Sequence, residues 1–119
     1  MYDSYKRRID YLRISVTDKC NLRCRYCMPE EGVAPRRHED FLSHEQIVEV
    51  VRAAVGLGLT KIRLTGGEPL VRLGIVDFVQ MISRIPEIDD ISMTTNGVPW
   101  GVPVPGMGRS INVALNVHF

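Results

Sequence analysis

The order of strand-like and helix-like segments is the feature that most constrains the fold of this chain. Residues 10–17 alternate apolar and polar side chains as a half-buried strand does, and residues 60–65 and 90–95 form two further strand-like segments. A helical spacing of apolar residues begins at Ser43, and a second one covers about 75–85. Strands that alternate with helices predict an α/β fold with a parallel sheet, in which ligands collect at the carboxyl ends of the strands.

Local signals mark where the two helices begin and end. The sequence Ser-His-Glu-Gln at 43–46 is a capping box, which predicts the start of the first helix, and the Gly-Leu-Gly sequence that begins at residue 56 predicts its end. In the second helix, Val76, Val79 and Ile82 are expected on one apolar side, and Pro86 prevents continuation.

The character of the chain changes after Gly97. Residues 98–110 contain three prolines and several glycines, so no amphipathic helix fits them. Apolar and polar residues alternate again over 111–117 and predict a fourth strand. Residues 98–110 are long enough for an irregular crossover, so we expect this strand to be parallel to the others. We therefore expect an amino-terminal part of a core domain over 1–97 and a divergent Pro/Gly-rich segment over 98–119.

Length and composition exclude several classes of protein. The 119 residues have the size of one domain, and a formal net charge of +1 gives no overall field for nucleic acid or an anionic membrane. No apolar run approaches the roughly 18–20 residues of a spanning helix, and the first residues lack the apolar centre of a signal peptide. We expect a cytoplasmic protein, in which clustered cysteines are kept reduced and serve as metal ligands or catalytic groups.

All three cysteines of the chain, Cys20, Cys24 and Cys27, lie on the predicted loop after the first strand. A closed zinc site needs four ligands, so three thiolates would need His38 or His44 as the fourth. A [4Fe–4S] cluster held by three cysteines would instead leave one iron open for a substrate or cofactor. The cysteines alone leave both sites open.

A glycine turn follows the second strand. The sequence Leu-Thr-Gly-Gly-Glu-Pro-Leu at 64–70 places two adjacent glycines where a ligand could approach the backbone, and Glu68 offers an acceptor. Arg13 and Arg63 lie on the polar side of two neighbouring strands. An arginine within a strand is costly unless it meets an anion, so the pair indicates a nucleotide or phosphate substrate, and a position on the rim of the sheet is the alternative.

The two motifs together resemble the radical S-adenosylmethionine (SAM) superfamily, and the segments Leu-Arg-Ile-Ser-Val-Thr-Asp-Lys-Cys, Lys-Ile-Arg-Leu-Thr-Gly-Gly-Glu-Pro and Thr-Thr-Asn-Gly are similar to one family within it. Members of that family are lyases that turn GTP into a cyclic pyranopterin at the start of molybdenum cofactor biosynthesis. The resemblance implies an α/β fold that is the incomplete amino-terminal part of a parallel (β/α) barrel of the TIM type. It also implies one [4Fe–4S] cluster, SAM as cofactor, GTP as substrate and an electron donor as partner. By position, it implies that Cys20, Cys24 and Cys27 hold the cluster, that Tyr26, Gly66, Gly67 and Glu68 contact SAM, and that Arg13, Arg63 and Thr94 contact GTP.

The chain departs from that family after Gly97. The family has a helix where this chain has residues 98–110, a serine that contacts SAM where this chain has Ala114, and three further cysteines for a second cluster. We therefore expect a truncated or frame-disrupted copy that is marginally stable or associates with another chain. The alternatives are a radical SAM enzyme acting on a peptide or small molecule, and a non-catalytic metal-binding fragment.

Overall fold

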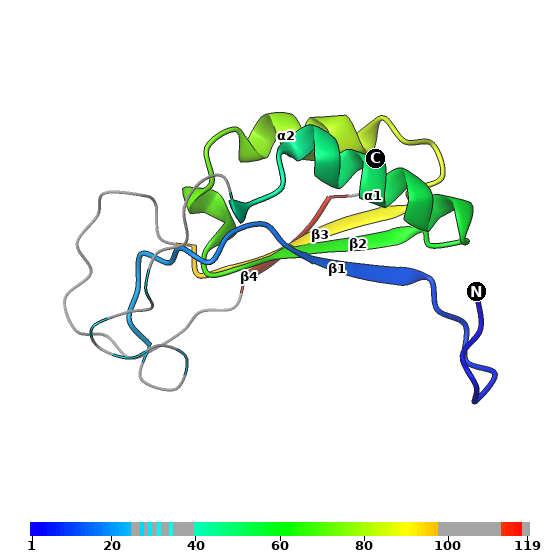
Figure 1. The fold of residues 1–119 in the computed structure, drawn as a ribbon, viewed down its shortest axis with the longest axis horizontal. Coiled ribbons are helices and arrows are strands. Elements are labelled where there is room, and N and C mark those ends of the chain that lie inside the picture. Colours follow the sequence, from blue (N-terminus) through cyan, green and yellow to red (C-terminus); the bar gives the residue numbers. More distant parts are fainter. Residues whose placement is uncertain are drawn as a thin grey trace.

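The strands and helices follow one another in the predicted order. The computed structural model describes residues 1–24, 27, 29, 31, 34 and 40–97, together with the backbone of 113–117. The elements are β1 (Tyr11–Ser15), α1 (His44–Gly56), β2 (Lys61–Thr65), the short 3-10 helix η2 (Pro69–Val71), α2 (Ile75–Ser83), β3 (Asp90–Thr95) and β4 (Val113–Val117). The sheet has the order β1-β2-β3-β4, and α1 and α2 both cover the same face of it (Figure 1). The three predicted strands up to residue 95 and both predicted helices are confirmed.

The parallel part of the sheet is confirmed, whereas the parallel fourth strand is wrong. The strands β1, β2 and β3 are parallel to one another, but β4 is antiparallel to β3 and pairs Val113 with Thr95. The first residue of β4 therefore lies beside the last residue of β3. A chain that returns at the same end of a sheet pairs antiparallel and needs no crossover. The described part of the chain is thus a three-stranded parallel α/β unit, as in a partial radical SAM core, with an antiparallel strand at its edge.

The first helix begins as its capping box predicts. The Ser43 side chain accepts a hydrogen bond from Gln46 N at 3.2 Å, and the Gln46 side chain accepts one from Ser43 N at 2.8 Å. Gly58 follows the helix with a φ of 91°, a conformation that glycine adopts without strain.

The apolar side of α2 differs from the prediction in one position. Its buried residues are Ile75, Phe78 and Ile82, whereas Val76 is 77% exposed. Residues three and four apart share a helix face, so placing Ile75 and Phe78 inward turns Val76 toward solvent.

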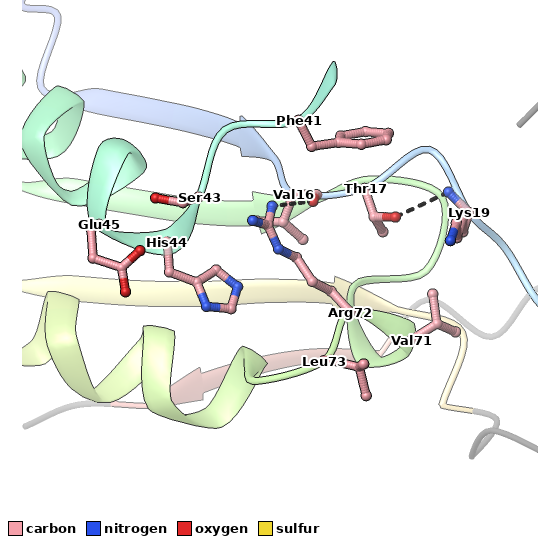
Figure 2. Close-up of a pocket in the computed structure, with 10 residues that line it drawn as sticks. All are labelled: Val16, Thr17, Lys19, Phe41, Ser43, His44, Glu45, Val71, Arg72 and Leu73. Carbon is pink, nitrogen blue, oxygen red and sulfur yellow. Dashed lines mark hydrogen bonds between the residues drawn. The ribbon is translucent and has the colours of Figure 1, made fainter. Parts of the chain in front are cut away.

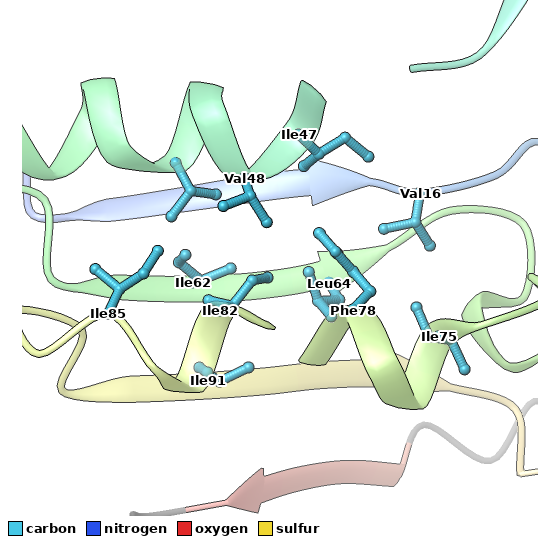
Figure 3. Packing of buried hydrophobic residues seen from close by; sticks show 11 residues of the cluster. Val16, Ile47, Val48, Ile62, Leu64, Ile75, Phe78, Ile82, Ile85 and Ile91 are labelled. Carbon is cyan, nitrogen blue, oxygen red and sulfur yellow. The ribbon is translucent and has the colours of Figure 1, made fainter. Parts of the chain in front are cut away.

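The core lies between the helices and one face of the sheet (Figure 3). The helices contribute a layer centred on Val51 and Phe78, both with no exposed area, and β2 contributes Ile62 and Leu64. The remaining buried members of this cluster are Val16, Ile47, Val48, Ile75, Ile82, Ile85 and Ile91. In the part of the chain that the structure describes, no helix is long and apolar enough to cross a membrane.

His44, the first residue of α1, is packed against this core. Its ring stacks on Phe78 with ring centroids 4.9 Å apart, and its buried Nε2 has no hydrogen-bond partner among the described residues. Burial and then the positive charge of Arg72 lower the pKa of His44 below its usual value of 6.5, against the opposing effect of Glu45 and Asp77. The folded chain therefore favours a neutral imidazole at this position.

This packing predicts a stability that falls in mild acid. Because the pKa of His44 is lower in the folded chain than in the unfolded chain, its contribution is present above pH 6.5 and is lost as the pH falls toward the folded pKa. We expect the melting temperature to drop between pH 7.5 and pH 5.5, and His44→Gln to reduce that drop. Thermal unfolding of both proteins across this range is the measurement. If the melting temperature of His44→Gln falls by the same amount, groups other than His44 cause the pH dependence of stability.

Candidate functional site

The segments that follow β1 and β2 are bonded to each other at the carboxyl edge of the parallel sheet. The amide of Gly67 donates to the carbonyl of Thr17, and the amide of Glu68 donates to the carbonyl of Lys19, both at 2.8 Å. Thr17 and Lys19 lie near the start of the loop that carries the cysteines, which we call the cysteine loop (residues 16–42). The glycine turn therefore fixes the first residues of this loop.

The two glycines are required by this contact. A β-carbon on Gly66 would lie too close to the Thr17 carbonyl oxygen, and one on Gly67 would lie too close to the Lys19 carbonyl oxygen. Both distances would be well below 3.0 Å, which real β-carbons essentially never show. Gly66 also has a φ of 153°, which other residues rarely adopt. The absence of side chains thus lets one backbone segment lie directly against another. The sequence indicated only that a ligand could approach the backbone here.

Glu68 is almost fully buried, with 1% of its area exposed, and its carboxylate accepts three hydrogen bonds. The donors are Leu70 N at 2.9 Å, Thr95 Oγ1 at 2.7 Å and Asn96 N at 2.6 Å. A buried carboxylate is costly unless such donors replace water, so this set stabilises it. Glu68 thereby joins the end of β3 to the glycine turn.

The end of β3 is in turn connected to the cysteine loop. The side-chain amide of Asn96 donates to the side-chain oxygen of Asn21 at 2.9 Å, and Asn21 directly follows Cys20. The loop is therefore held from two neighbouring strands at once.

The structure places the three cysteines as free thiols on one loop. Cys20 and Cys24 are half-buried and Cys27 is exposed, and Cys27 N donates to Cys24 O at 2.9 Å. Within the described residues, no three His, Cys, Asp or Glu side chains are grouped as ligands of one ion. Tyr26 and His38 lie outside the described residues.

Arg13 and Arg63 are brought together as predicted. They are direct partners in the pairing of β1 with β2, so their side chains leave the same, helix-free face of the sheet. Arg63 Nε donates to Ser92 Oγ at 3.1 Å, and its guanidinium lies 5.8 Å from the centre of the Tyr11 ring. Thr94 is half-buried two residues beyond Ser92 on β3. Like charges in register repel each other, so this face favours an anionic partner.

A cavity of about 340 Å³ opens where the cysteine loop leaves β1 and enters α1 (Figure 2). Arg72, His44 and Lys19 are among its lining residues. Burial lowers the pKa of the Arg72 guanidinium below its usual value, but arginine stays charged at neutral pH. A second cavity of about 540 Å³ runs along β1 and includes Arg13, Asp18 and, again, Arg72.

Sequence reasoning identified Glu68 but missed its partners Thr95 and Asn96, the bond from Asn96 to Asn21, and Arg72. The signal was partly visible, since Asn96 belongs to the Thr-Thr-Asn-Gly turn and Arg72 ends the segment that begins with the two glycines. Nothing in the sequence shows that these turns meet, because each bond joins residues far apart in the chain.

Comparisons with known proteins agree with this geometry. The sequence model of the radical SAM superfamily matches residues 14–101. The chain is 60% identical over 98 residues to a GTP 3′,8-cyclase of Alkaliphilus oremlandii, covering 82% of this chain and 31% of the relative. It is 54% identical over 121 residues to that of Petrotoga mobilis, covering 98% and 37%, and 62% identical over 98 residues to that of Pelotomaculum thermopropionicum, covering 82% and 30%. The chain thus spans about a third of the length of these relatives.

The contact between the glycine turn and the cysteine loop predicts opposite effects for three glycine-to-alanine changes. Gly66→Ala and Gly67→Ala force two backbones apart, so each should lower the free energy of unfolding by about 2–4 kcal/mol. Gly56→Ala is the matched control, because its β-carbon would meet nothing within 4 Å at the end of α1, and it should raise stability by about 0.5–1 kcal/mol. Urea unfolding of the three variants measures this. Equal free energies of unfolding for all three variants would contradict the close packing of Gly66 and Gly67 against the cysteine loop.

Proposed function

This chain belongs to the radical SAM superfamily, and from that premise we propose that it is the amino-terminal part of a GTP 3′,8-cyclase. The observation that carries the proposal is the pair of bonds by which Gly67 and Glu68 hold the first residues of the cysteine loop. These bonds bring the start of the cysteine loop, next to Cys20, and the glycine turn, which are distant in the sequence, to one edge of the sheet. The similarity to GTP 3′,8-cyclases over 82–98% of the chain supports the same reading.

The cysteine loop has the donor set for an iron–sulfur cluster. Thiolates are soft ligands that suit iron–sulfur clusters, and Cys20, Cys24 and Cys27 are free and at least partly accessible. We assign these three to a [4Fe–4S] cluster, which leaves one iron for SAM. When bound, the cluster supplies one electron for the reductive cleavage of SAM, and an external donor replaces that electron.

The glycine turn is assigned to SAM. Tyr26 and the backbone of Gly66 and Gly67 are the proposed contacts. Because the Glu68 carboxylate already accepts three internal hydrogen bonds, its proposed contribution is to fix the turn. In this arrangement the sheet edge orients SAM, and the residues around it exclude water from the reacting bond.

The polar face of the sheet is assigned to GTP. Arg13 and Arg63 lie in register on β1 and β2, and Thr94 lies on β3. Ser92 engages only Nε of Arg63, so the terminal nitrogens can donate to phosphate oxygens. A polyanion such as a triphosphate relieves the repulsion between the two guanidinium groups, which a neutral substrate would not do.

The proposed organisation treats residues 1–97 as part of the radical SAM core and 98–119 as a divergent segment. Association with a second copy is part of the proposal, because β1 is an edge strand of the sheet in the part of the chain that the structure describes. A different substrate for the same radical chemistry, or metal binding without catalysis, are the alternatives that the next two experiments separate.

Anaerobic reconstitution tests the cluster and SAM. We expect about four iron and four sulfide ions per chain, a change in the electron paramagnetic resonance (EPR) spectrum of the reduced cluster on adding SAM, and formation of 5′-deoxyadenosine with dithionite. Cys24→Ser should lose most of the iron, and Ser83→Ala, on the far end of α2, is the matched control. Zinc alone with no 5′-deoxyadenosine would support a non-catalytic metal-binding fragment instead.

Arginine substitutions test the substrate. We expect Arg13→Ala and Arg63→Ala each to weaken GTP binding about 10-fold or more, because each removes charged hydrogen bonds. Arg52→Ala is the control for net charge, since Arg52 pairs with Glu49 on the exposed side of α1. Calorimetric titration with GTP at fixed ionic strength is the measurement. If the chain cleaves SAM but does not bind GTP, another substrate is favoured. If Arg52→Ala weakens GTP binding as much as the other two changes do, Arg13 and Arg63 are not specific parts of the GTP site.

A further inference from the structure

The cysteine loop begins and ends at one arginine side chain. Arg72 Nη1 donates to the carbonyl of Val16, directly after β1, and Nη2 donates to the carbonyl of Leu42 at 2.6 Å, directly before the capping residue of α1. Figure 2 shows the Arg72 side chain reaching from the segment after η2 toward Val16. A single guanidinium therefore bridges the two ends of the loop that carries the cysteines.

The chemistry of this bridge suits arginine. The guanidinium is planar and presents its two terminal nitrogens in a fixed fork, so one side chain can bind two carbonyl oxygens at the same time. The ammonium of lysine is a point charge on a flexible stem and has no such fork. Arg72 is half-buried and Val16 is 1% exposed, so losing the Arg72 donors would leave the Val16 carbonyl partly buried without this partner, whereas Leu42 is exposed.

The backbone of Arg72 is itself held in place. Arg72 N donates to Pro69 O at 3.1 Å and caps η2, and Ile75 N donates to Arg72 O at 3.3 Å at the start of α2. The same short segment begins with the glycine turn, which already binds Thr17 and Lys19. Arg72 also lines both cavities beside the loop.

We propose that Arg72 is a positioning residue that closes the cysteine loop by binding both of its ends, so that the cysteines are kept ready for the cluster. The closure rests on the contacts of Arg72 alone, whereas its effect on the cluster rests on the proposed function. Arg72 acts through the loop and is not assigned a contact with the cluster, SAM or GTP.

Hydrogen exchange of the cluster-free, reduced 119-residue chain tests the closure. The variants are Arg72→Met, which keeps an apolar stem and removes the donors, Arg72→Lys, which keeps the charge, and the matched control Arg84→Met at the exposed end of α2. We expect Arg72→Met to raise exchange several-fold in peptides that cover both loop ends, while β2 and α2 exchange as in the parent. Arg72→Lys should be intermediate, and it carries the test if Arg72→Met does not fold. If both loop ends exchange hydrogen in Arg72→Met at the same rate as in the parent chain, the proposal is wrong.

Cluster loading tests the consequence. After reconstitution, we expect Arg72→Met to hold several-fold less iron than the parent and to give an altered EPR spectrum, with partial recovery in Arg72→Lys and none of these changes in Arg84→Met. If Arg72 has a role in stability alone, Arg72→Met will have a lower melting temperature but an unchanged EPR spectrum of the loaded cluster. That result would overturn the proposal. If the parent itself binds no cluster, the proposed function fails, and the exchange experiment still decides the closure.

Discussion

Two backbone hydrogen bonds between the glycine turn and the first residues of the cysteine loop are the contact on which the rest of the site depends. They require that Gly66 and Gly67 have no side chains, because the carbonyls of Thr17 and Lys19 occupy that space. In a parallel sheet all strands end at the same edge, and the segments that leave two neighbouring strands normally diverge from there. Here they are joined, so the loop starts from a fixed position relative to β2.

The candidate site and the hydrophobic core are stabilised by different interactions. The core is a layer of aliphatic side chains and Phe78 between the helices and the sheet, whereas the site edge is held by hydrogen bonds to Glu68, Asn96 and Arg72. Each such bond contributes only about 1 kcal/mol, but a buried group left without its partner costs about 1–3 kcal/mol. Changes at this edge therefore alter the position of the loop more selectively than changes in the core.

Local features of the fold could be read from the sequence, and features that depend on distant contacts could not. The capping box at Ser43 and the alternation of β1 were visible because the determining residues are neighbours in the chain. The direction of β4 was predicted wrongly because pairing direction depends on where the chain returns, which the alternation of 111–117 does not encode. For the site, the position of Arg13 and Arg63 on neighbouring strands followed from the parallel pattern, whereas their pairing in register came from the structure. The bonds from Thr95 and Asn96 to Glu68 did not follow from the pattern, because they join turns that are 27 or 28 residues apart.

The arrangement also explains how the two ends of a long loop are held in place. Closing a flexible loop costs conformational entropy that grows only slowly with its length, roughly as the logarithm of the number of residues, so most of the cost lies in fixing its ends. In this chain the segment that starts with the glycine turn and ends at Arg72 binds the loop at Val16, Thr17, Lys19 and Leu42. The ends are therefore fixed by a rigid part of the fold before any ligand is present. Among the described residues of the loop, only Val16 and Thr17 are buried. The positions of Cys20, Cys24 and Cys27, which lie close together in the sequence, are therefore not needed for core packing.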